Sequence, residues 1–283
     1  MKKIGLALGG GGARGLAHIP MLEVFDELGI RPYRIAGTSI GAVVGALYAS
    51  GLSGAEIRDG VRGMLMAKGE SLRKALRRKD TFKWIKFLDL EFGHGGLFKG
   101  DKFIDFLYEA MSVSRFAELQ IPLQVVTTDF YSAEQVVIES GELLDAIKAS
   151  MALPGLFTPV QRDGRVLIDG GSVNPVPFDL LADCDMVVAI NVMGELRQTP
   201  HKMPSLFRVV LGTFDIMQKS IITEKLKSDP PDVYITPDIL NIDILEFYKA
   251  EEIYAQAQPA CRKLKRILEQ LSAGITPLPS GSF

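Results

Sequence analysis

Residues 37–41 read GTSIG, a G-x-S-x-G pattern that separates two apolar runs. Residues 33–38 are expected to form a strand and residues 40–50 a helix, which places Ser39 at a sharp strand-to-helix turn. Such a turn crowds the backbone around the serine, and the small residues Gly37 and Gly41 relieve the clashes. The hydroxyl then emerges at a helix N-terminus, where the helix dipole favours developing negative charge. The pattern predicts a nucleophilic serine; a glycine-rich turn with an incidental serine is the alternative.

A second glycine cluster precedes this turn. Residues 9–15 read GGGGARG, between a buried strand expected over residues 3–8 and a helix expected from Gly15 to Leu28. Consecutive glycines allow backbone N–H groups to converge on one anion, because no side chain shields them. Arg14 is expected to help orient this loop. The residues expected to form an oxyanion hole are Gly10, Gly11, Gly12 and Arg14.

Two other interpretations of the glycine cluster remain open. Residues 10–15 also satisfy G-x-G-x-x-G, the pattern of a dinucleotide-binding turn. That site needs an acidic residue about twenty positions further on, at the end of the second strand. The sequence has Gly37, Thr38 and Ser39 there instead, and the Gly-Lys-Ser/Thr of a P-loop is missing. A plain structural turn is the third possibility.

A third motif, Asp169 followed by Gly170 and Gly171, comes directly after a strand expected over residues 165–168. An aspartate at a strand end, followed by two glycines, is expected to be held in a tight loop. Taken alone this pattern is weak evidence, because Asp-Gly pairs mostly mark turns. One such pair, at residues 163–164, predicts a hairpin between residues 160 and 166.

The order of the elements predicts the class of fold. The chain opens strand, helix, strand, helix, which argues for a parallel sheet covered on both faces. Further strands are expected over residues 123–128, 135–139 and 186–192, and near residues 233–236. Helices are expected over residues 101–111 and 143–151, with two or three more in the C-terminal part.

The three motifs, in this order, resemble those of the patatin-like phospholipases, and look closest to the bacterial members related to neuropathy target esterase. The motif residues besides the serine and the aspartate are Gly10, Gly11, Gly12, Arg14, Gly15, Gly37, Gly41, Gly170 and Gly171. Residues 149–157, ASMALPGLF, also resemble the family segment that precedes its catalytic aspartate, and Thr128-Asp129 resembles a strand end in that family.

This resemblance implies a three-layer α/β/α patatin-like fold with a largely parallel central sheet. It covers residues 1–192, expected to be a catalytic domain, and leaves residues 193–283 as a C-terminal helical extension packed on the same domain. It also implies a serine lipid acyl hydrolase of the phospholipase or lysophospholipase type, with a dyad of Ser39 and Asp169 and an acyl-enzyme intermediate. Aspartate is ordinarily a weak base, so we expect a dry site in which its hydrogen bond with the serine raises its basicity.

Composition excludes several classes of function. The 283 residues carry a formal net charge of -2, which argues against a nucleic-acid partner. Cys184 and Cys261 have no metal-binding spacing and indicate a reducing compartment, so the protein is expected in the cytoplasm. The histidines are too few and too scattered for zinc, and neither a metal nor a cofactor is expected. Residues 35–55 are uncharged but only mildly apolar, so we interpret them as a strand and a buried helix instead of a membrane span.

Residues 68–92 mix basic and aromatic side chains, including Arg73, Lys74 and Trp84. This mixture favours peripheral contact with an anionic membrane surface. A solvated helix followed by a core segment is the alternative. The oligomeric state is left open.

Three other functions compete with lipid hydrolysis. An acyltransferase would use the same acyl-enzyme with an alcohol in place of water. A regulatory protein would retain the hydrolase pocket without turnover, and a nucleotide-dependent oxidoreductase would need the missing acidic residue. A histidine base would require His18, His94 or His201. His18 is close in sequence to the glycine loop and could neighbour the site, although a packed helix residue is the preferred interpretation; the contexts of His94 and His201 do not suggest a rigidly held base. We therefore expect a dyad and no triad.

Overall fold

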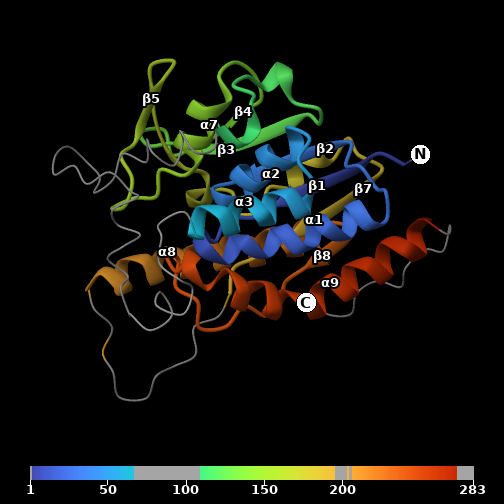
Figure 1. The fold of residues 1–283 in the computed structure, drawn as a ribbon. Helices are drawn as coiled ribbons and strands as arrows, with labels where there is room; N and C mark the ends of the chain where they lie inside the picture. The colour runs from blue at the N-terminus through green and yellow to red at the C-terminus, as the bar shows by residue number, and fades with distance from the viewer. Residues whose placement is uncertain (1, 67–108, 195–202, 204–205, 273–283) are drawn as a thin grey trace.

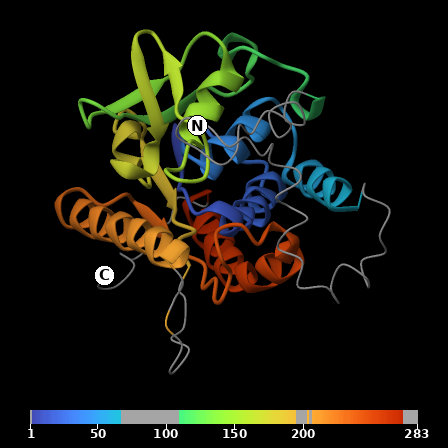
Figure 2. The ribbon, with the colours of Figure 1, turned by 90° about the vertical axis from the view of Figure 1, so that its left-hand side faces the viewer.

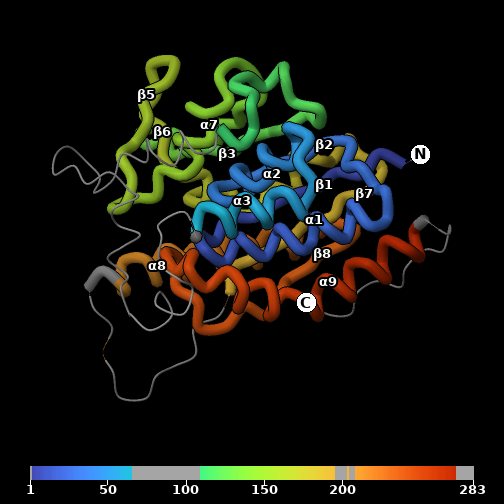
Figure 3. The backbone as a smooth tube through the Cα atoms, in the orientation of Figure 1, coloured from blue at the N-terminus to red at the C-terminus, as the bar shows by residue number. Residues whose placement is uncertain are grey.

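The computed structural model describes residues 2–66, 109–194, 203 and 206–272. Within them the strands form one eight-stranded sheet in the order β5-β6-β3-β2-β1-β7-β8, with β4 also paired to β3. The strands that run parallel to one another are β1 (Ile4–Leu8), β2 (Arg34–Thr38), β3 (Leu123–Asp129), β7 (Met186–Ile190) and β8 (Val233–Ile235). The antiparallel strands at one end of the sheet are β4 (Gln135–Ile138), β5 (Val160–Arg162) and β6 (Arg165–Asp169). The expected hairpin is present, because Arg162 pairs with Arg165 across a two-residue turn; Figure 3 shows it at the edge of the molecule.

Helices cover both faces of the sheet. Figure 1 shows three of them in front of the strands: α1 (His18–Glu27), α2 (Ile40–Ala49) and α3 (Gly54–Met66). On the same face α7 (Leu143–Ser150) packs on β3, and α9 (Ala250–Ser272) packs on α1. The opposite face is covered by the short 3-10 segment Phe178–Leu181 and by α8 (Leu206–Ser228). The expected three-layer α/β/α fold is thereby confirmed.

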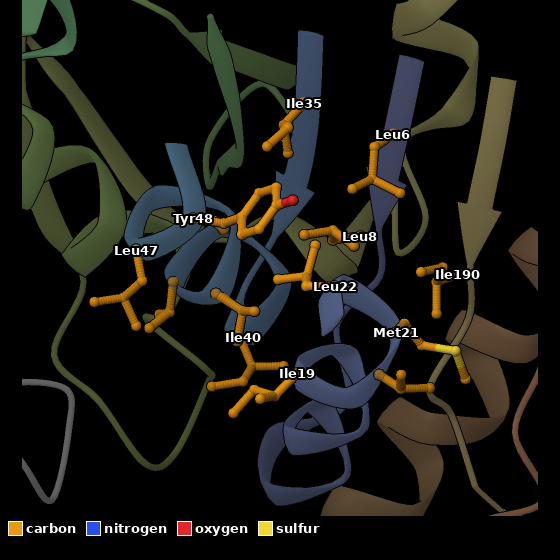
Figure 4. Packing of buried hydrophobic residues seen from close by; sticks show 14 of the residues in the cluster. Leu6, Leu8, Ile19, Met21, Leu22, Ile35, Ile40, Leu47, Tyr48 and Ile190 are labelled. Atoms are coloured by element: carbon orange, nitrogen blue, oxygen red, sulfur yellow. The ribbon is translucent and has the colours of Figure 1, made fainter. Parts of the chain in front are cut away.

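The alternation of side chains along the central strands explains why the sheet needs both layers. Leu6 and Leu8 of β1 are fully buried on the side of α1 and α2, whereas Ala7 between them is fully buried on the side of α8. Figure 4 shows Leu8 next to Leu22 of α1, with Ile35 of β2 nearby. A strand buried on both faces is typical of a parallel sheet with crossover helices. The core therefore starts directly beneath the loops that follow β1 and β2.

The helix expected from Gly15 to Leu28 begins later than expected. A 3-10 turn spans Gly12–Ala17, and regular α-helix starts only at His18. Pro20 has no N–H to donate to a carbonyl four residues earlier, so it fits best in the first turn of a helix. The chain before it is therefore free to adopt the tighter turn.

The residues beyond 192 contribute to the same fold. β8 extends the sheet from β7, and Ile253 and Leu264 of α9 are fully buried in the main core. The domain boundary that we expect at residue 192 stays a prediction. The helix expected over residues 101–111 lies mostly outside the described residues, as does the basic stretch 68–92. Within the described part of the chain, none of the helices combines the length and apolar character that a membrane crossing requires.

The packing of α2 on the sheet generates a prediction about Gly41. A Cβ atom at this position would lie 2.1 Å from the carbonyl oxygen of Leu8, which is backbone and cannot rotate away. We expect Gly41→Ala to lower the free energy of unfolding by about 3 kcal/mol or more, as measured by urea denaturation. The matched control is Gly60→Ala in α3, where a Cβ meets nothing within 4 Å. The control is expected to raise stability by about 0.5–1 kcal/mol. Equal behaviour of the two variants would contradict this account of the packing.

Candidate active site

Ser39 lies between β2 and α2 with a strained backbone. Its φ of 54° and ψ of -125° place it in a region that non-glycine residues rarely adopt. The carbonyl of Ser39 accepts hydrogen bonds from the N–H groups of Ala42 and Val43, at 2.9 and 3.2 Å. Gly37 is needed at the same turn, because a Cβ there would lie 2.6 Å from the Cα of Ala42. The turn therefore has the geometry of a nucleophile elbow.

Ser150, at the end of α7, supports this elbow from below. Its hydroxyl oxygen accepts a hydrogen bond from the N–H of Ser39 at 2.8 Å, and the hydroxyl donates to the carbonyl of Val126 at 2.6 Å. Ser150 is fully buried. The strained backbone of the elbow is thus tied to β3. Sequence reasoning assigned no role to Ser150, although the segment 149–157 that contains it was part of the family resemblance.

Asp169 ends β6 with both carboxylate oxygens engaged. Oδ2 accepts a hydrogen bond from the Ser39 hydroxyl at 2.7 Å, and Oδ1 accepts one from the N–H of Gly171 at 2.7 Å. The side chain is 2% exposed. The two motifs, 130 positions apart in the chain, therefore meet directly.

Burial raises the pKa of Asp169 from 3.8 to about 6, while the hydrogen bonds from Ser39 and Gly171 oppose the rise. The expectation that the hydrogen bond with the serine would increase the basicity of the aspartate is therefore wrong in its cause. A hydrogen bond donated to a carboxylate stabilises the charged form and lowers its pKa. The dry surroundings alone move the carboxylate toward the range of a useful general base.

The glycine loop after β1 passes beside Ser39. A Cβ at Gly10 would lie 3.5 Å from the Cβ of Ser39. The N–H of Gly10 donates to the carbonyl of Pro175 at 3.0 Å, so this amide is already engaged. No acceptor among the described residues takes the N–H of Gly11 or Gly12. Of the three loop amides expected to bind an anion, these two are available to do so.

Arg14 is buried, and its guanidinium donates hydrogen bonds within the protein. Nε donates to the carbonyl of Gly11 at 3.1 Å, and Nη2 donates to both carboxylate oxygens of Asp215 at 3.0 Å. Asp215 lies on α8, so this contact anchors the glycine loop to that helix. The arrangement fits the expectation that Arg14 orients the loop, and Asp215 is a partner that sequence reasoning missed.

Two further polar residues, which the sequence analysis did not single out, lie close to the segments that hold Ser39 and Asp169. Gln218 of α8 is 5% exposed and lies so close to Gly171 that a Cβ there would be 1.9 Å from its side-chain nitrogen. The carbonyl of Asn174 accepts a hydrogen bond from the hydroxyl of Thr38 at 2.8 Å. Neither residue belongs to a recognisable motif, because their positions depend on how α8 packs on the loop after β6.

His18 is the one histidine within the described residues. It is fully buried, and its Nε2 lies 2.8 Å from the carbonyl oxygen of Gly9. Burial lowers its pKa from 6.5 to about 4. The hydrogen bonds of the Asp169 carboxylate go to Ser39 and Gly171, and none goes to His18. His18 therefore contacts the loop that follows β1 and is not a hydrogen-bond partner of Asp169.

Metal and nucleotide binding find no support in the described part of the chain. No group of three or more His, Cys, Asp or Glu side chains there could hold a metal ion. At the end of β2, where a dinucleotide site needs an acidic residue, the structure has the fully buried Thr38. The site is built instead from one hydroxyl, one buried carboxyl and a glycine loop.

The three-layer α/β fold and the serine at the strand-to-helix turn, hydrogen-bonded to a buried aspartate, together characterise the structural class of this protein. The chain belongs to the patatin-like phospholipase family, whose model matches residues 6–182. The resemblance found in the motifs is thereby confirmed.

Individual relatives agree with this assignment. An uncharacterized NTE family protein of Mycobacterium tuberculosis (strain ATCC 25618 / H37Rv) is 34% identical over 194 residues, which are 68% of this chain and 49% of that protein. The lysophospholipase NTE1 of Kluyveromyces lactis is 31% identical over 275 residues, covering 89% of this chain and 18% of the yeast protein. The crystal structure of VipD from Legionella pneumophila shares the fold, with a TM-score of 0.54 and 12% identity over 94% of this chain and 66% of that one. The chain thus spans about half the length of its mycobacterial relative.

The buried carboxyl of Asp169 generates a prediction about stability and pH. Its pKa is higher in the folded protein than the ordinary 3.8, so its protonated form stabilises the fold at low pH. This contribution is fully present below pH about 4 and is lost as the pH rises through about 6, a loss of about 3 kcal/mol. His18 acts with the opposite sign, because its pKa is lowered and its contribution is lost as the pH falls. A comparison of Asp169→Asn with the wild type cancels the effect of His18.

We expect Asp169→Asn to gain about 3 kcal/mol of stability relative to the wild type between pH about 4 and pH about 7. Asparagine keeps the two hydrogen bonds, since its oxygen can accept from Gly171 and its amide can donate to the Ser39 hydroxyl. The measurement is urea denaturation of both proteins across this pH range. A stability difference that stays constant with pH would contradict a buried, ionising Asp169.

Proposed function

We propose that this protein is a serine hydrolase of lipid acyl esters that uses Ser39 as nucleophile and Asp169 as general base. The observation that carries the proposal is the 2.7 Å contact between the Ser39 hydroxyl and a carboxylate whose burial raises its pKa to about 6. An aspartate with this pKa accepts a proton more readily than an exposed one, and it already accepts a hydrogen bond from the Ser39 hydroxyl whose proton must leave.

In the first half of the reaction, the Ser39 oxygen attacks the ester carbonyl carbon while Asp169 takes the hydroxyl proton. The electron pair of the carbonyl moves to its oxygen, and the N–H groups of Gly11 and Gly12 stabilise the resulting oxyanion. The start of α2 adds its dipole at the same place. Collapse of the tetrahedral intermediate breaks the bond to the leaving alcohol, which takes the proton from Asp169 and leaves an acyl-enzyme.

In the second half, Asp169 accepts a proton from a water molecule that attacks the acyl-enzyme. The second tetrahedral intermediate collapses, the fatty acid leaves, and Ser39 recovers its proton. A positively charged group is not required beside Ser39, because the amides of the glycine loop bind the developing charge. Arg14 contributes only by holding the loop, since its own charge is paired with Asp215.

The substrate class follows from family membership and from the surroundings of the loop. The matching family is described as phospholipases, and one relative is named a lysophospholipase. An apolar cluster lies against the same loop, where Ile244 contacts Gly12. Its members are Leu153, Leu156, Phe157, Leu211, Phe214, Ile244 and Leu245. Apolar side chains of this kind bind an acyl chain by excluding water, and they provide no hydrogen bonds to a polar ester.

The nucleophile is tested by Ser39→Ala. We expect the variant to lose ester hydrolysis by several orders of magnitude, as is usual for serine nucleophiles, while it keeps its fold. The measurements are release of p-nitrophenol from a short soluble ester, release of fatty acid from a lysophospholipid, and covalent labelling by a fluorophosphonate probe. Labelling of the wild type but not of the variant supports the proposal. A folded Ser39→Ala protein that hydrolyses the soluble ester near the wild-type rate would refute it.

A dyad is distinguished from a triad by replacing His18 and Asp169 separately. Asp169→Asn removes the proton acceptor and is expected to abolish turnover. His18→Gln keeps a donor for the Gly9 carbonyl, so kcat is expected to stay within about tenfold of the wild type, or roughly 1.4 kcal/mol in the barrier. His94 and His201 lie outside the described residues, and the same substitution is expected to leave kcat within the same range. A folded histidine variant as inactive as Asp169→Asn would mean that a triad operates.

A further inference from the structure

One side of α8 presents aliphatic side chains to solvent. Val209, Val210, Ile216 and Met217 are 46%, 53%, 70% and 55% exposed. The last three follow Val209 by one, seven and eight positions, which places all four on one side of the helix. We call this stripe the outer face of α8. Figure 2 shows the helix, in orange, lying along the outside of the molecule. Single exposed aliphatic residues are normal on a protein surface, whereas several gathered in one patch indicate an interaction site.

The opposite side of α8 holds the candidate active site together. Asp215 binds Arg14 of the glycine loop, and Gln218 lies against Gly171 beside the dyad. Ile222 is buried against the sheet. An α-helix with its side chains is about 10 Å across, so whatever binds the outer face lies about one helix diameter from the loops that surround Ser39.

The charges on this part of α8 select the chemistry of the partner. Along Leu206–Ser228 the acidic residues are Asp215, which is turned inward and paired with Arg14, and the exposed Glu224, which is paired with Lys227. Arg208 and Lys219, both exposed, lie on the helix surface between the outer face and Asp215, and Arg208 also lies 3.4 Å from Asp243. An aliphatic stripe with cationic neighbours complements an anionic lipid surface, because the aliphatic groups enter the acyl boundary while the cations meet phosphates.

We propose that the outer face of α8 docks on the surface of an anionic lipid bilayer. The proposal rests on the proposed function, since a lipid acyl hydrolase must draw its substrate from such a surface. Docking through α8 holds the glycine loop, together with the apolar cluster that includes Leu211 and Phe214, about one helix diameter from the membrane surface. The residues of this face differ from the stretch 68–92, for which the sequence predicts membrane contact and which lies outside the described residues.

The test measures vesicle binding without turnover. Ile216→Gln/Met217→Gln is made in the Ser39→Ala background, so that lipids remain intact, and is sedimented with vesicles of phosphatidylglycerol and phosphatidylcholine. We expect its partition coefficient to fall by about tenfold or more relative to Ser39→Ala alone. The matched control is Ser220→Gln/Thr223→Gln on the same helix, which replaces exposed polar residues and is expected to bind as Ser39→Ala does. Raised salt and vesicles of phosphatidylcholine alone are expected to weaken binding of the unsubstituted face.

Activity separates this proposal from the proposed function. With Ser39 intact, Ile216→Gln/Met217→Gln is expected to hydrolyse a soluble ester at the wild-type rate and vesicle-borne lipid at least about tenfold more slowly. A wild-type protein that does not hydrolyse the soluble ester would refute the proposed function. The vesicle-binding result would still test the docking proposal. Unchanged vesicle binding of the substituted protein would overturn the docking proposal. So would a wild-type dimer that these substitutions convert to a monomer without any vesicle binding, because the face would then join two copies of the chain.

Discussion

The left-handed backbone of Ser39 is the constraint on which the rest of the site depends. A residue with a side chain adopts it at a cost of about 1–3 kcal/mol, so it persists only where the surroundings hold it firmly. Here the support comes from three directions. The first turn of α2 binds the Ser39 carbonyl, Ser150 binds its N–H, and Gly41 lets α2 press directly on the end of β1. β1, β2, β3, α2 and α7 are therefore parts of one support for a single hydroxyl group.

Electrostatically, the site gives the Asp169 carboxylate no positively charged hydrogen-bond partner among the described residues. The charge of Arg14 is paired with Asp215, and His18 has its pKa lowered to about 4 by burial. The carboxyl of Asp169 is thus buried with neutral partners, the Ser39 hydroxyl and the Gly171 amide. This isolation raises its pKa, and it destabilises the folded protein at neutral pH. A site that costs stability in this way is common where a group must act as a base.

α8 connects features that are separate in the sequence. Its inner side contacts the glycine loop and the loop after Asp169, and its outer face presents aliphatic side chains to solvent. The family model ends at residue 182, so this helix lies beyond the matched region. The chain covers about half of its mycobacterial relative and a smaller part of the yeast one.

The sequence by itself determined the strand-turn-helix at Ser39, the glycine loop, the Asp169 turn and the order of layers, because these follow from backbone sterics and periodicity within a few residues. The periodicity of apolar residues predicted that α1 starts at Gly15, whereas it starts at His18, because Pro20 belongs in the first turn of the helix. Only the tertiary structure decided which groups meet. Gly10 loses its free amide to Pro175, Arg14 finds Asp215 at a separation of 201 positions, and the elbow rests on Ser150. Such pairings depend on how distant segments pack, and no local pattern of residues encodes the distance between them.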